Sequence, residues 1–296
     1  MERCDVVIVG GGPAGSSCAR KLHEAGLGVI VLDRAVFPRD KVCAGWITPQ
    51  AIDELELDCA DYQIKLAARD TVADGPIVGG VDHVARTAHT RAESRNRAPG
   101  DAASWPAAPG VPELYFCRDL SGYGWCFRKG QHINIGFGLL GRRSLTKAMA
   151  EFVAFLRAQH RIPADAPRGW RGHAYLVADA HRRRATGDGV LLIGDAAGVA
   201  YPESGEGIRP AIESGLLAAS TLIAAKRSCS RERLERYERT LRRRGGGQRG
   251  RRWLARAMMP ALTATLLPRL LGTRWFTRHL VLDRWFLHAH DPTPTW

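Results

Sequence analysis

The sequence predicts an α/β protein in which two α/β segments flank an antiparallel sheet along the chain. An apolar run, a glycine-rich turn, a helical pattern and a second apolar run follow one another over residues 5–33, which is the order of a β-α-β unit. Short aromatic and β-branched runs separated by turn residues occupy 113–139 and indicate antiparallel strands. A further apolar strand at 190–194 leads through a small-residue loop into a helix over 206–225.

The composition is that of a globular chain with an unusual charge. Apolar residues make up 45% and charged residues 25% of the 296 residues, which excludes a fibre, a fully disordered chain and a disulfide-stabilised mini-protein. The net charge of +13 favours anionic partners such as phosphate-bearing cofactors or membrane surfaces. The basic clusters at 181–184 and 242–252 are interpreted as solvated helix ends, so no nucleic-acid partner is expected.

The cysteine and histidine patterns argue against a metal site. The seven cysteines lack CxxC spacing and the ten histidines are scattered, so neither a metal site nor a disulfide framework is expected. The first ten residues do not resemble a signal peptide, and prolines interrupt the longest apolar stretch, 253–271, before it reaches a bilayer-spanning length. We therefore expect a cytoplasmic protein, and this amphipathic stretch leaves peripheral membrane contact open.

The turn at 10–15 has the G-x-G-x-x-G spacing of a dinucleotide site. In that spacing Gly10 permits a tight turn, Gly12 lets a pyrophosphate approach the backbone, and Gly15 permits close helix–strand packing. The helix that follows offers free N–H groups and its positive dipole end to phosphates. Asp33 stands 18 residues after Gly15 at the end of the second strand, where a carboxylate can accept hydrogen bonds from a ribose.

A second motif, residues 194–208, predicts where a flat ring would bind. Asp195 follows an apolar strand and can accept from a ribityl hydroxyl, while Gly205 and Gly207 allow close backbone approach. The start of the next helix would stabilise negative charge on the pyrimidine side of a reduced flavin. A purely structural strand–turn–helix is the alternative interpretation.

These motifs resemble those of a known family. GGGPAG at 10–15 and GDAAGVAYPESGEGI at 194–208 look like FAD-dependent oxidoreductases of the glutathione-reductase superfamily. KVCAGWITPQ at 41–50 and GYGWCFRKG at 122–130 narrow the resemblance to the geranylgeranyl reductase family. The resemblance implies a discontinuous Rossmann-like FAD-binding domain, FAD as cofactor and reduction of isoprenoid double bonds. An external electron donor, NAD(P)H or a ferredoxin-like protein, would reduce the flavin.

The resemblance also assigns candidate site residues. Cys43 is the candidate catalytic residue, because family members keep a cysteine beside the flavin; a small packing residue is the alternative. Ala44 stands where the family has a glycine. The residues expected to bind FAD are Gly10, Gly12, Ala14, Gly15, Asp33, Arg34, Cys43, Ala44, Gly45, Asp195, Gly205, Gly207 and Ile208.

An aromatic segment is the candidate substrate site. Tyr123, Trp125 and Phe127 alternate, so in a strand they share one face. Such a face can line a cavity for a hydrophobic prenyl chain, and core packing is the alternative. The family has a proline after these aromatic residues, where this chain has Arg128.

The expected domain layout has a gap in its middle. We expect an antiparallel substrate domain and a C-terminal helical segment beside the FAD domain. The resemblance covers 1–57 and 113–296 but fails over 58–112, where the family completes its FAD site. The alternatives are an FAD-dependent monooxygenase and a non-catalytic truncated remnant with impaired FAD binding. The expected boundaries are 1–73 and 185–225 for the FAD domain, 74–112 for an irregular linker, 113–184 for the substrate domain and 226–296 for the C-terminal segment.

Overall fold

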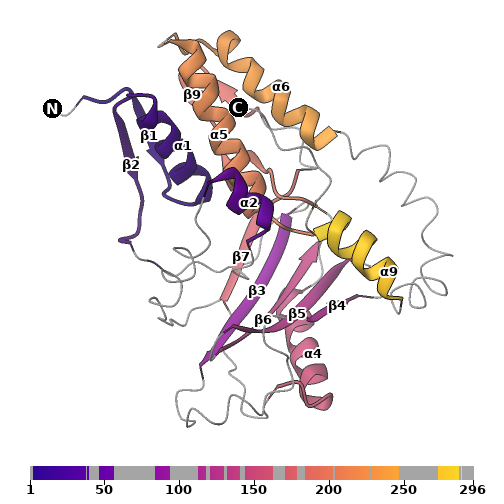
Figure 1. Cartoon of the computed structure of the whole chain (residues 1–296). Helices are drawn as coiled ribbons and strands as arrows, with labels where there is room; N and C mark the ends of the chain where they lie inside the picture. Colours follow the sequence, from indigo (N-terminus) through magenta and orange to yellow (C-terminus); the bar gives the residue numbers. More distant parts are fainter. Residues whose placement is uncertain are drawn as a thin grey trace. The chain divides into compact units, whose positions relative to one another are not determined.

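The computed structural model divides into two compact units (Figure 1). Unit 1 comprises Met1–Arg39, Ile47–Lys65 and Leu176–Trp296, and unit 2 comprises Asp40–Trp46 and Leu66–Tyr175. The structure describes residues 3–37, 39, 47–56, 84–93, 113–117, 121–129, 132–140, 144–162, 171–178, 184–202, 204–226, 228–246, 273–286 and 288.

Unit 1 begins with the predicted β-α-β segment. Strands β1 (Val6–Val9) and β2 (Val29–Leu32) pair in parallel, with Val6 opposite Val29, and helix α1 (Pro13–Glu24) connects them. Pro13 suits the first turn of α1 because its missing N–H would have no helical partner there. The other elements of unit 1 are α2 (Pro49–Glu54), β8 (Thr186–Gly187), β9 (Val190–Leu191), η2 (Gly194–Ala197), α5 (Ile208–Ala225), α6 (Arg231–Gly246), α9 (Arg274–Phe276) and η3 (Thr277–Phe286).

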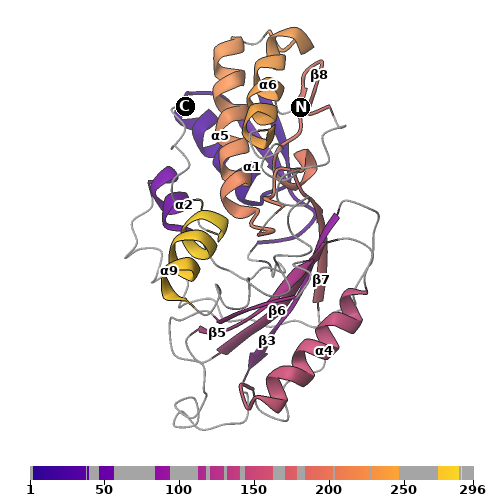
Figure 2. The ribbon, with the colours of Figure 1, turned by 90° about the vertical axis from the view of Figure 1, so that its right-hand side faces the viewer.

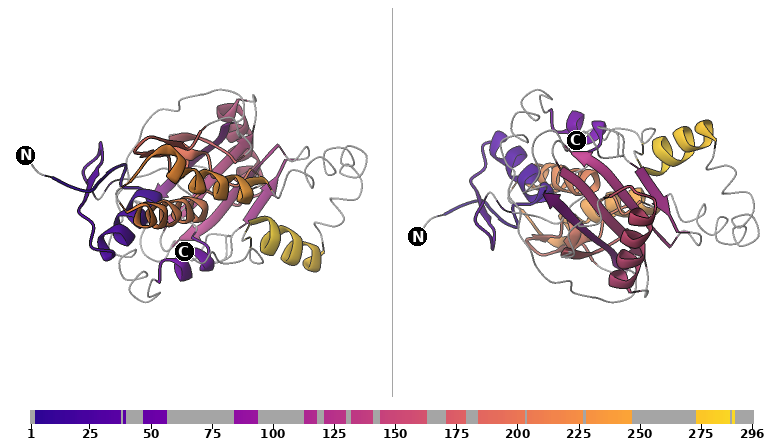
Figure 3. Two further views of the ribbon diagram at one scale, coloured as in Figure 1. Left: turned by 90° about the horizontal axis from the view of Figure 1, so that it is seen from above. Right: turned by 90° about the horizontal axis from the view of Figure 1, so that it is seen from below.

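The core of unit 1 lies between its first strands and its helices. Helix α5 packs against both α1 and α6, as Figure 3 shows from two sides. Ile8, Leu22 and Tyr237 are buried together there, and the Tyr237 hydroxyl donates to the Leu192 carbonyl at 2.5 Å. This bond satisfies the one polar atom that the Tyr237 side chain brings into the core.

The apolar run at 5–9 predicted a strand buried on both faces, and that prediction is wrong for one face. Ile8 is buried toward α1, but Val7 is 54% exposed and Val9 is 83% exposed. In β2, Leu32 is likewise half exposed. Among the described residues β1 pairs only with β2, so the helices cover one face of a two-stranded sheet and the alternate side chains face outward.

The predicted strand at 190–194 is also shorter than expected. Only Val190–Leu191 forms a strand, β9, and it pairs antiparallel with β8 through a tight turn at Gly189, whose φ is +66°. Gly194, with φ +57°, then turns the chain into the short helix η2. The positive φ of Gly194 ends the extended backbone, which continues past β9 to Ile193.

Unit 2 is built on a five-stranded sheet in the order β4-β5-β6-β3-β7. Strands β4 (Glu113–Phe116), β5 (Gly122–Lys129) and β6 (His132–Leu140) pair antiparallel in sequence order, which confirms the predicted meander. The outer strand β7 is Arg171–Leu176. Strand β3 (Val84–Glu93) pairs with β6 inside the region that was expected to be an irregular linker. The small and polar residues of β3 do not predict a strand. Pairing along the whole length of β6 stabilises it.

Helix α4 (Leu145–Ala158) covers one face of this sheet (Figure 2). Its N-cap is Ser144, whose hydroxyl accepts the Lys147 N–H at 3.3 Å. Phe152 lies over Gly124 so closely that a Cβ there would come within 2.5 Å of the ring. The buried residues of this core include Cys126, Ile133, Ile135, Phe137, Leu139, Met149 and Leu156.

One described helix corrects the expectation that no segment is long and apolar enough to span a membrane. Helix α5 has 18 residues and a mean hydropathy of 1.2. It is 72% buried inside the structure, which is typical of a core helix.

Candidate functional site

Three of the four glycines at 10–15 differ in what their positions require. Gly10 has φ +103°, which other residues rarely adopt. A Cβ on Gly15 would come within 1.9 Å of the Gly10 carbonyl oxygen, so only glycine fits there. Gly12 has φ −74° and no heavy atom within 4 Å of the place of a Cβ. The backbone at Gly12 therefore borders open space.

The N-terminus of α1 meets this open space without a side-chain cap. Gly12 is the N-cap and makes no side-chain hydrogen bond, and the first turn contains no acidic residue. The N–H groups of such a turn lack helical acceptors and carry the positive end of the helix dipole. A phosphate group fits this arrangement, because it can approach Gly12 closely and accept those N–H groups.

Asp33 ties the end of β2 to this turn. Its Oδ2 accepts the Gly11 N–H at 2.7 Å and its Oδ1 accepts the Ala35 N–H at 2.9 Å. These backbone hydrogen bonds lower the pKa of Asp33 below its ordinary value, and Arg39 and the exposed Arg34 add to the effect. An ionised carboxylate has about four acceptor positions, so two backbone bonds leave capacity for a ribose hydroxyl.

The two sequence motifs meet at Ala14. A Cβ on Gly194 would lie 3.0 Å from the Ala14 Cβ, and a Cβ on Gly215 would lie 2.2 Å from the Ala14 carbonyl oxygen. The Gly194 N–H donates to the Ser214 hydroxyl at 2.9 Å, which holds the η2 turn on α5. Asp195, in η2, therefore lies next to the first turn of α1 although 180 residues separate it from Gly15.

A closed loop leads from η2 to the start of α5. The Tyr201 N–H donates to the Glu206 carbonyl at 2.8 Å, and the Gly205 N–H donates to the Tyr201 carbonyl at 2.7 Å. Gly205 has φ +68°, which the loop requires. Gly207 is the N-cap of α5 and provides no side-chain cap. The loop fixes the backbone on which the first turn of α5 is built.

A carboxylate occupies that first turn. Glu206 Oε1 accepts the Arg209 N–H at 2.8 Å, and Oε2 is buried without a hydrogen-bond partner among the described residues. Burial raises the pKa of Glu206 to about 7, against the opposing effects of the Arg209 and Ile208 N–H groups and of His288. Glu206 can therefore gain or lose a proton near neutral pH.

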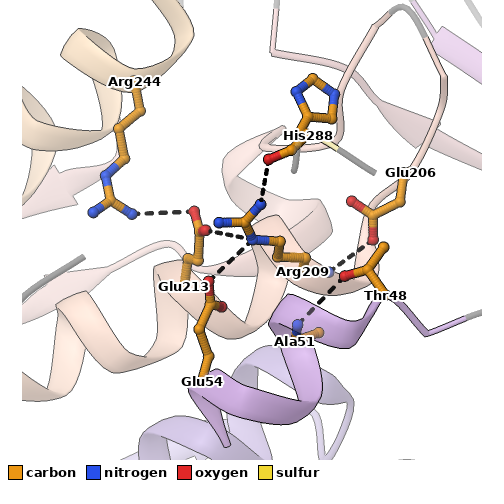
Figure 4. Close-up of polar contacts among 8 residues, drawn as sticks. All are labelled: Thr48, Ala51, Glu54, Glu206, Arg209, Glu213, Arg244 and His288. Carbon is orange, nitrogen blue, oxygen red and sulfur yellow. Dashed lines mark hydrogen bonds and ion pairs between the residues drawn. The ribbon is translucent and has the colours of Figure 1, made fainter. Parts of the chain in front are cut away.

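Behind Glu206 lies a buried network of charges (Figure 4). Arg209 Nε lies 3.0 Å from Glu54 Oε1 of α2 and 3.0 Å from Glu213 Oε1, and Arg244 Nη1 of α6 lies 3.1 Å from Glu213 Oε2. Burial and the neighbouring Glu54 raise the pKa of Glu213, although Arg209 and Arg244 lower it. The network joins α2, α5 and α6 at the base of the site.

The C-terminal segment reaches the same place through His288. The Arg209 Nη1 donates to the His288 carbonyl at 3.2 Å. The His288 imidazole is buried and stacks on the Tyr201 ring, with centroids 3.7 Å apart and an interplanar angle of 22°. Two separate contacts therefore hold His288 against the loop that precedes α5.

In unit 2, the candidate substrate residues lie on the face of β5 opposite to the one that α4 covers. Trp125 is directly opposite Gly136 on β6 and Tyr123 is opposite Gly138, so neither ring meets a side chain from its directly opposite residue on β6. The Tyr123 and Trp125 ring centroids are 5.9 Å apart, and Phe116 lies 5.9 Å from Tyr123.

One polar contact lies on this aromatic face. The Trp125 Nε1 donates to Asn134 Oδ1 at 2.8 Å, and both residues are buried. Phe127 is half-buried and lies directly opposite Asn134 on β6. The buried indole N–H on this face is therefore satisfied.

The structure brings together part of the predicted site. The residues of the first turn, Asp33 and the 194–208 motif lie in unit 1, whereas Cys43, Ala44 and Gly45 lie outside the described residues. Within the described part of the chain, no three His, Cys, Asp or Glu residues gather as metal ligands. Sequence reasoning missed Glu54, Arg209, Glu213 and His288. Charges inside the apolar helix 208–225 were the available signal for Arg209 and Glu213.

The comparisons with known proteins agree with a flavin site. An FAD binding domain family matches residues 3–96. A menaquinone reductase of Mycobacterium tuberculosis is 27% identical over 314 aligned positions, covering 75% of this chain and 77% of that protein. A digeranylgeranylglycerophospholipid reductase of Methanocaldococcus jannaschii is 32% identical over 132 positions, covering 43% of this chain and 34% of that protein.

These matches bear on the central segment. The FAD binding domain match runs to residue 96, although the resemblance was expected to fail from residue 58. The alignment with the menaquinone reductase has 314 positions but includes only 75% of this chain. The relative therefore contains residues that have no counterpart in this chain. A geranylgeranyl bacteriochlorophyll reductase-like protein from Thermoplasma acidophilum shares the fold, with a TM-score of 0.66, 18% identity and 91% of each chain covered.

Proposed function

We propose that this chain, an FAD-dependent oxidoreductase related to the geranylgeranyl reductases, reduces C=C bonds in isoprenoid chains. FAD is its cofactor and, when bound, supplies hydride-transfer chemistry. The observation that carries the proposal is the convergence at Ala14 of the uncapped α1 N-terminus and the Gly194–Asp195 turn. A dinucleotide cofactor needs such a site because its phosphates and its ribityl chain are bound by different loops.

The residues of unit 1 would hold the cofactor at separate points. The open backbone at Gly12 and the first turn of α1 would receive the pyrophosphate, and Asp33 would accept from the adenosine ribose. Asp195 would accept from the ribityl chain, and the turn at Gly205, Gly207 and Ile208 would receive the ring end. By resemblance, Ala44 and Gly45 would lie beside the ring with Cys43, whose role on or near the flavin stays a proposal.

The aromatic face of unit 2 supports a hydrophobic substrate. Tyr123, Trp125 and Phe127 share that face, and the residues opposite two of them on β6 are glycines, which add no side chain that a substrate would have to displace. Two relatives are named for substrates of this kind, since menaquinone and digeranylgeranylglycerophospholipid both carry isoprenoid chains. The face would position the chain and exclude water, which hydride transfer to a double bond requires.

The reaction balances with an external reductant. Addition of one hydride and one proton converts the C=C bond to a CH–CH bond, and NAD(P)H or a ferredoxin-like donor supplies the two electrons. We propose with it the domain layout expected from the sequence, which is a discontinuous FAD domain and a separate substrate domain. The cytoplasmic location is proposed as well.

We also propose that α6 contacts anionic membranes from the aqueous side. Arg236, Arg239 and Arg243 are exposed, follow one another at intervals of three and four residues, and make no ion pair with any described residue. A stripe of arginines on one helix face attracts anionic headgroups. Such contact would bring the enzyme to substrates dissolved in a bilayer.

Purified protein and FAD test the cofactor site directly. The wild type should bind FAD and show a visible flavin spectrum, and Gly12→Ala should weaken binding by at least tenfold. Because the Cβ of Gly12→Ala meets only open space, its melting temperature should match that of the wild type. Gly187→Ala is the control, since its Cβ would make one ordinary contact 3.8 Å from Val190. A colourless wild type that ignores added FAD would indicate the non-catalytic remnant.

Product analysis tests the reaction. Chemically reduced enzyme under anaerobic conditions should add two hydrogens to a geranylgeranyl lipid, as seen by mass spectrometry. Trp125→Ala should lower the turnover of this lipid and leave FAD affinity unchanged. Oxygen-dependent NADPH consumption with a hydroxylated product would contradict the reductase and favour the monooxygenase.

A further inference from the structure

The start of α5 already binds a negative group of this chain. Glu206 Oε1 accepts the Arg209 N–H at 2.8 Å, and the Ile208 N–H also hydrogen-bonds to this carboxylate. Oε2 is buried and has no hydrogen-bond partner among the described residues. The ionised carboxylate therefore uses the same N–H groups and the same helix dipole that a ligand at the start of α5 would use.

A ligand and an ionised Glu206 oppose each other at this turn. Acceptor atoms on the ring end of FAD would compete with the carboxylate for the N–H groups of Ile208 and Arg209. A neutral carboxyl removes the repulsion and can instead donate its own O–H to an acceptor atom. The two components are thus compatible when Glu206 carries a proton.

We propose that FAD binding is coupled to proton uptake at Glu206, so that the neutral carboxyl accompanies the bound cofactor. The inference rests on the proposed function, because it requires the ring end of FAD at the start of α5. It makes Glu206 a positioning residue whose protonation state sets cofactor affinity near neutral pH.

The described charges around Glu206 balance one another without it. The titratable and charged side chains that share its surroundings come from α2, α5, α6, the preceding loop and the C-terminal segment. Apart from Glu206, two of the described groups are carboxylates and two are guanidinium groups, so an ionised Glu206 is the one charge among them that is not offset when the histidine is neutral. They are Glu54, Glu206, Glu213, Arg209 and Arg244, with His288 and Tyr201 stacked at the edge.

The direction of the coupling follows from electrostatics. FAD brings two phosphate charges into unit 1, and a nearby negative charge raises the pKa of a carboxyl. Loss of the two N–H partners raises it further. The main chain of Glu206 stays at this turn, because its carbonyl accepts the Tyr201 N–H at 2.8 Å and its N–H donates to the Ser204 hydroxyl at 3.2 Å. Glu206 is therefore expected to take up a proton, and not to release one, when FAD binds.

Isothermal titration calorimetry of FAD into the apoprotein measures the coupling. At pH 7.5, repeated in phosphate, HEPES and Tris, the wild type should take up about half a proton or more per FAD, and its affinity should fall as pH rises from 6 to 8.5. Glu206→Gln should take up none and show a flat affinity profile. Glu151→Gln, the same change at an exposed position of α4, should behave as the wild type.

The outcomes separate this inference from the proposed function. Proton release by the wild type, no proton exchange, or equal uptake by Glu206→Gln would each overturn the coupling while leaving FAD as cofactor. A wild type that binds no FAD in any buffer would overturn both. Thermal unfolding of each apoprotein shows whether Glu206→Gln is folded, and Glu206→Asp, which retains a titrating carboxyl, should restore part of the uptake.

Discussion

Gly215 of α5 lies against Ala14 of α1 so closely that a Cβ on Gly215 would be 2.2 Å from the Ala14 carbonyl oxygen. The contact sets the distance between the helix that would receive the pyrophosphate and the helix that would receive the ring. It also fixes the η2 turn, because the neighbouring Ser214 accepts the Gly194 N–H. One glycine thus determines how the two halves of the proposed site fit together.

Gly215→Ala should therefore destabilise the protein and weaken FAD binding together. The clash is with backbone, which cannot rotate away, so α1 and α5 must move apart at a cost of about 2–3 kcal/mol. Urea unfolding of the apoprotein and FAD titration measure the two effects. Gly187→Ala is the matched control, and a Gly215→Ala protein as stable as that control would show that the helices are not closely packed here.

The pH profile of stability should slope downward between pH 5 and 8. The folded pKa of Glu206 is raised to about 7, so its proton stabilises the native state below the unfolded value of 4.5, and this contribution is lost as pH rises through 7. The conversion of 1.36 kcal/mol per pKa unit gives about 3 kcal/mol for the whole change. Glu213, also raised, adds a slope of the same sign.

Urea unfolding of the apoprotein at several pH values measures this slope. Glu206→Gln should flatten it, so the variant should gain stability relative to the wild type at pH 8 but not at pH 5, where the native wild type already holds the proton. The slope that Glu213 causes should remain. Glu151→Gln should leave the profile unchanged, and a steeper profile in Glu206→Gln would contradict the burial of this carboxyl.

Arg209→Met should be among the most damaging substitutions. It leaves Glu54 and Glu213 as buried carboxylates without the guanidinium that lies 3.0 Å from each. Removing one partner of a buried ion pair costs about 3–5 kcal/mol. The loss should be smaller at pH 5, where the carboxylates can take up protons, and the triple variant Arg209→Met/Glu54→Gln/Glu213→Gln should recover part of it. Equal losses at pH 5 and pH 8 would contradict this explanation.

How far the sequence predicts the site depends on the separation of the residues involved. The turn at 10–15 and Asp33 are readable because local backbone requirements determine them: Gly10 needs its positive φ and Gly15 has no room for a Cβ. Glu54 and Arg209 are 155 residues apart, and no local pattern reveals that they form an ion pair. Local sequence patterns therefore predict the glycine-rich turn and Asp33, but they do not predict the buried ion pairs behind the site.

The strand predictions failed where burial depends on neighbouring elements. An apolar run resembles a fully buried strand, yet Val9 is exposed because the described helices cover only one side of β1. In β3 a strand forms where none was predicted. Its Arg, His and Thr residues are typical of a linker, but Ala85 to Glu93 pair with β6. In both cases the neighbouring elements, and not the residue types alone, decide the outcome.

The arginine stripe of α6 should control membrane attachment. Arg236→Gln/Arg239→Gln/Arg243→Gln should weaken binding to vesicles of phosphatidylcholine with 30% phosphatidylserine by about 100-fold, since each arginine near an anionic surface contributes about 1 kcal/mol. Sedimentation at low and high salt measures it, and high salt should weaken wild-type binding as well. Glu232→Gln/Glu235→Gln on the same helix should strengthen binding, because it removes negative charge. Salt-independent binding, or equal binding to pure phosphatidylcholine, would assign attachment to apolar contacts elsewhere in the chain.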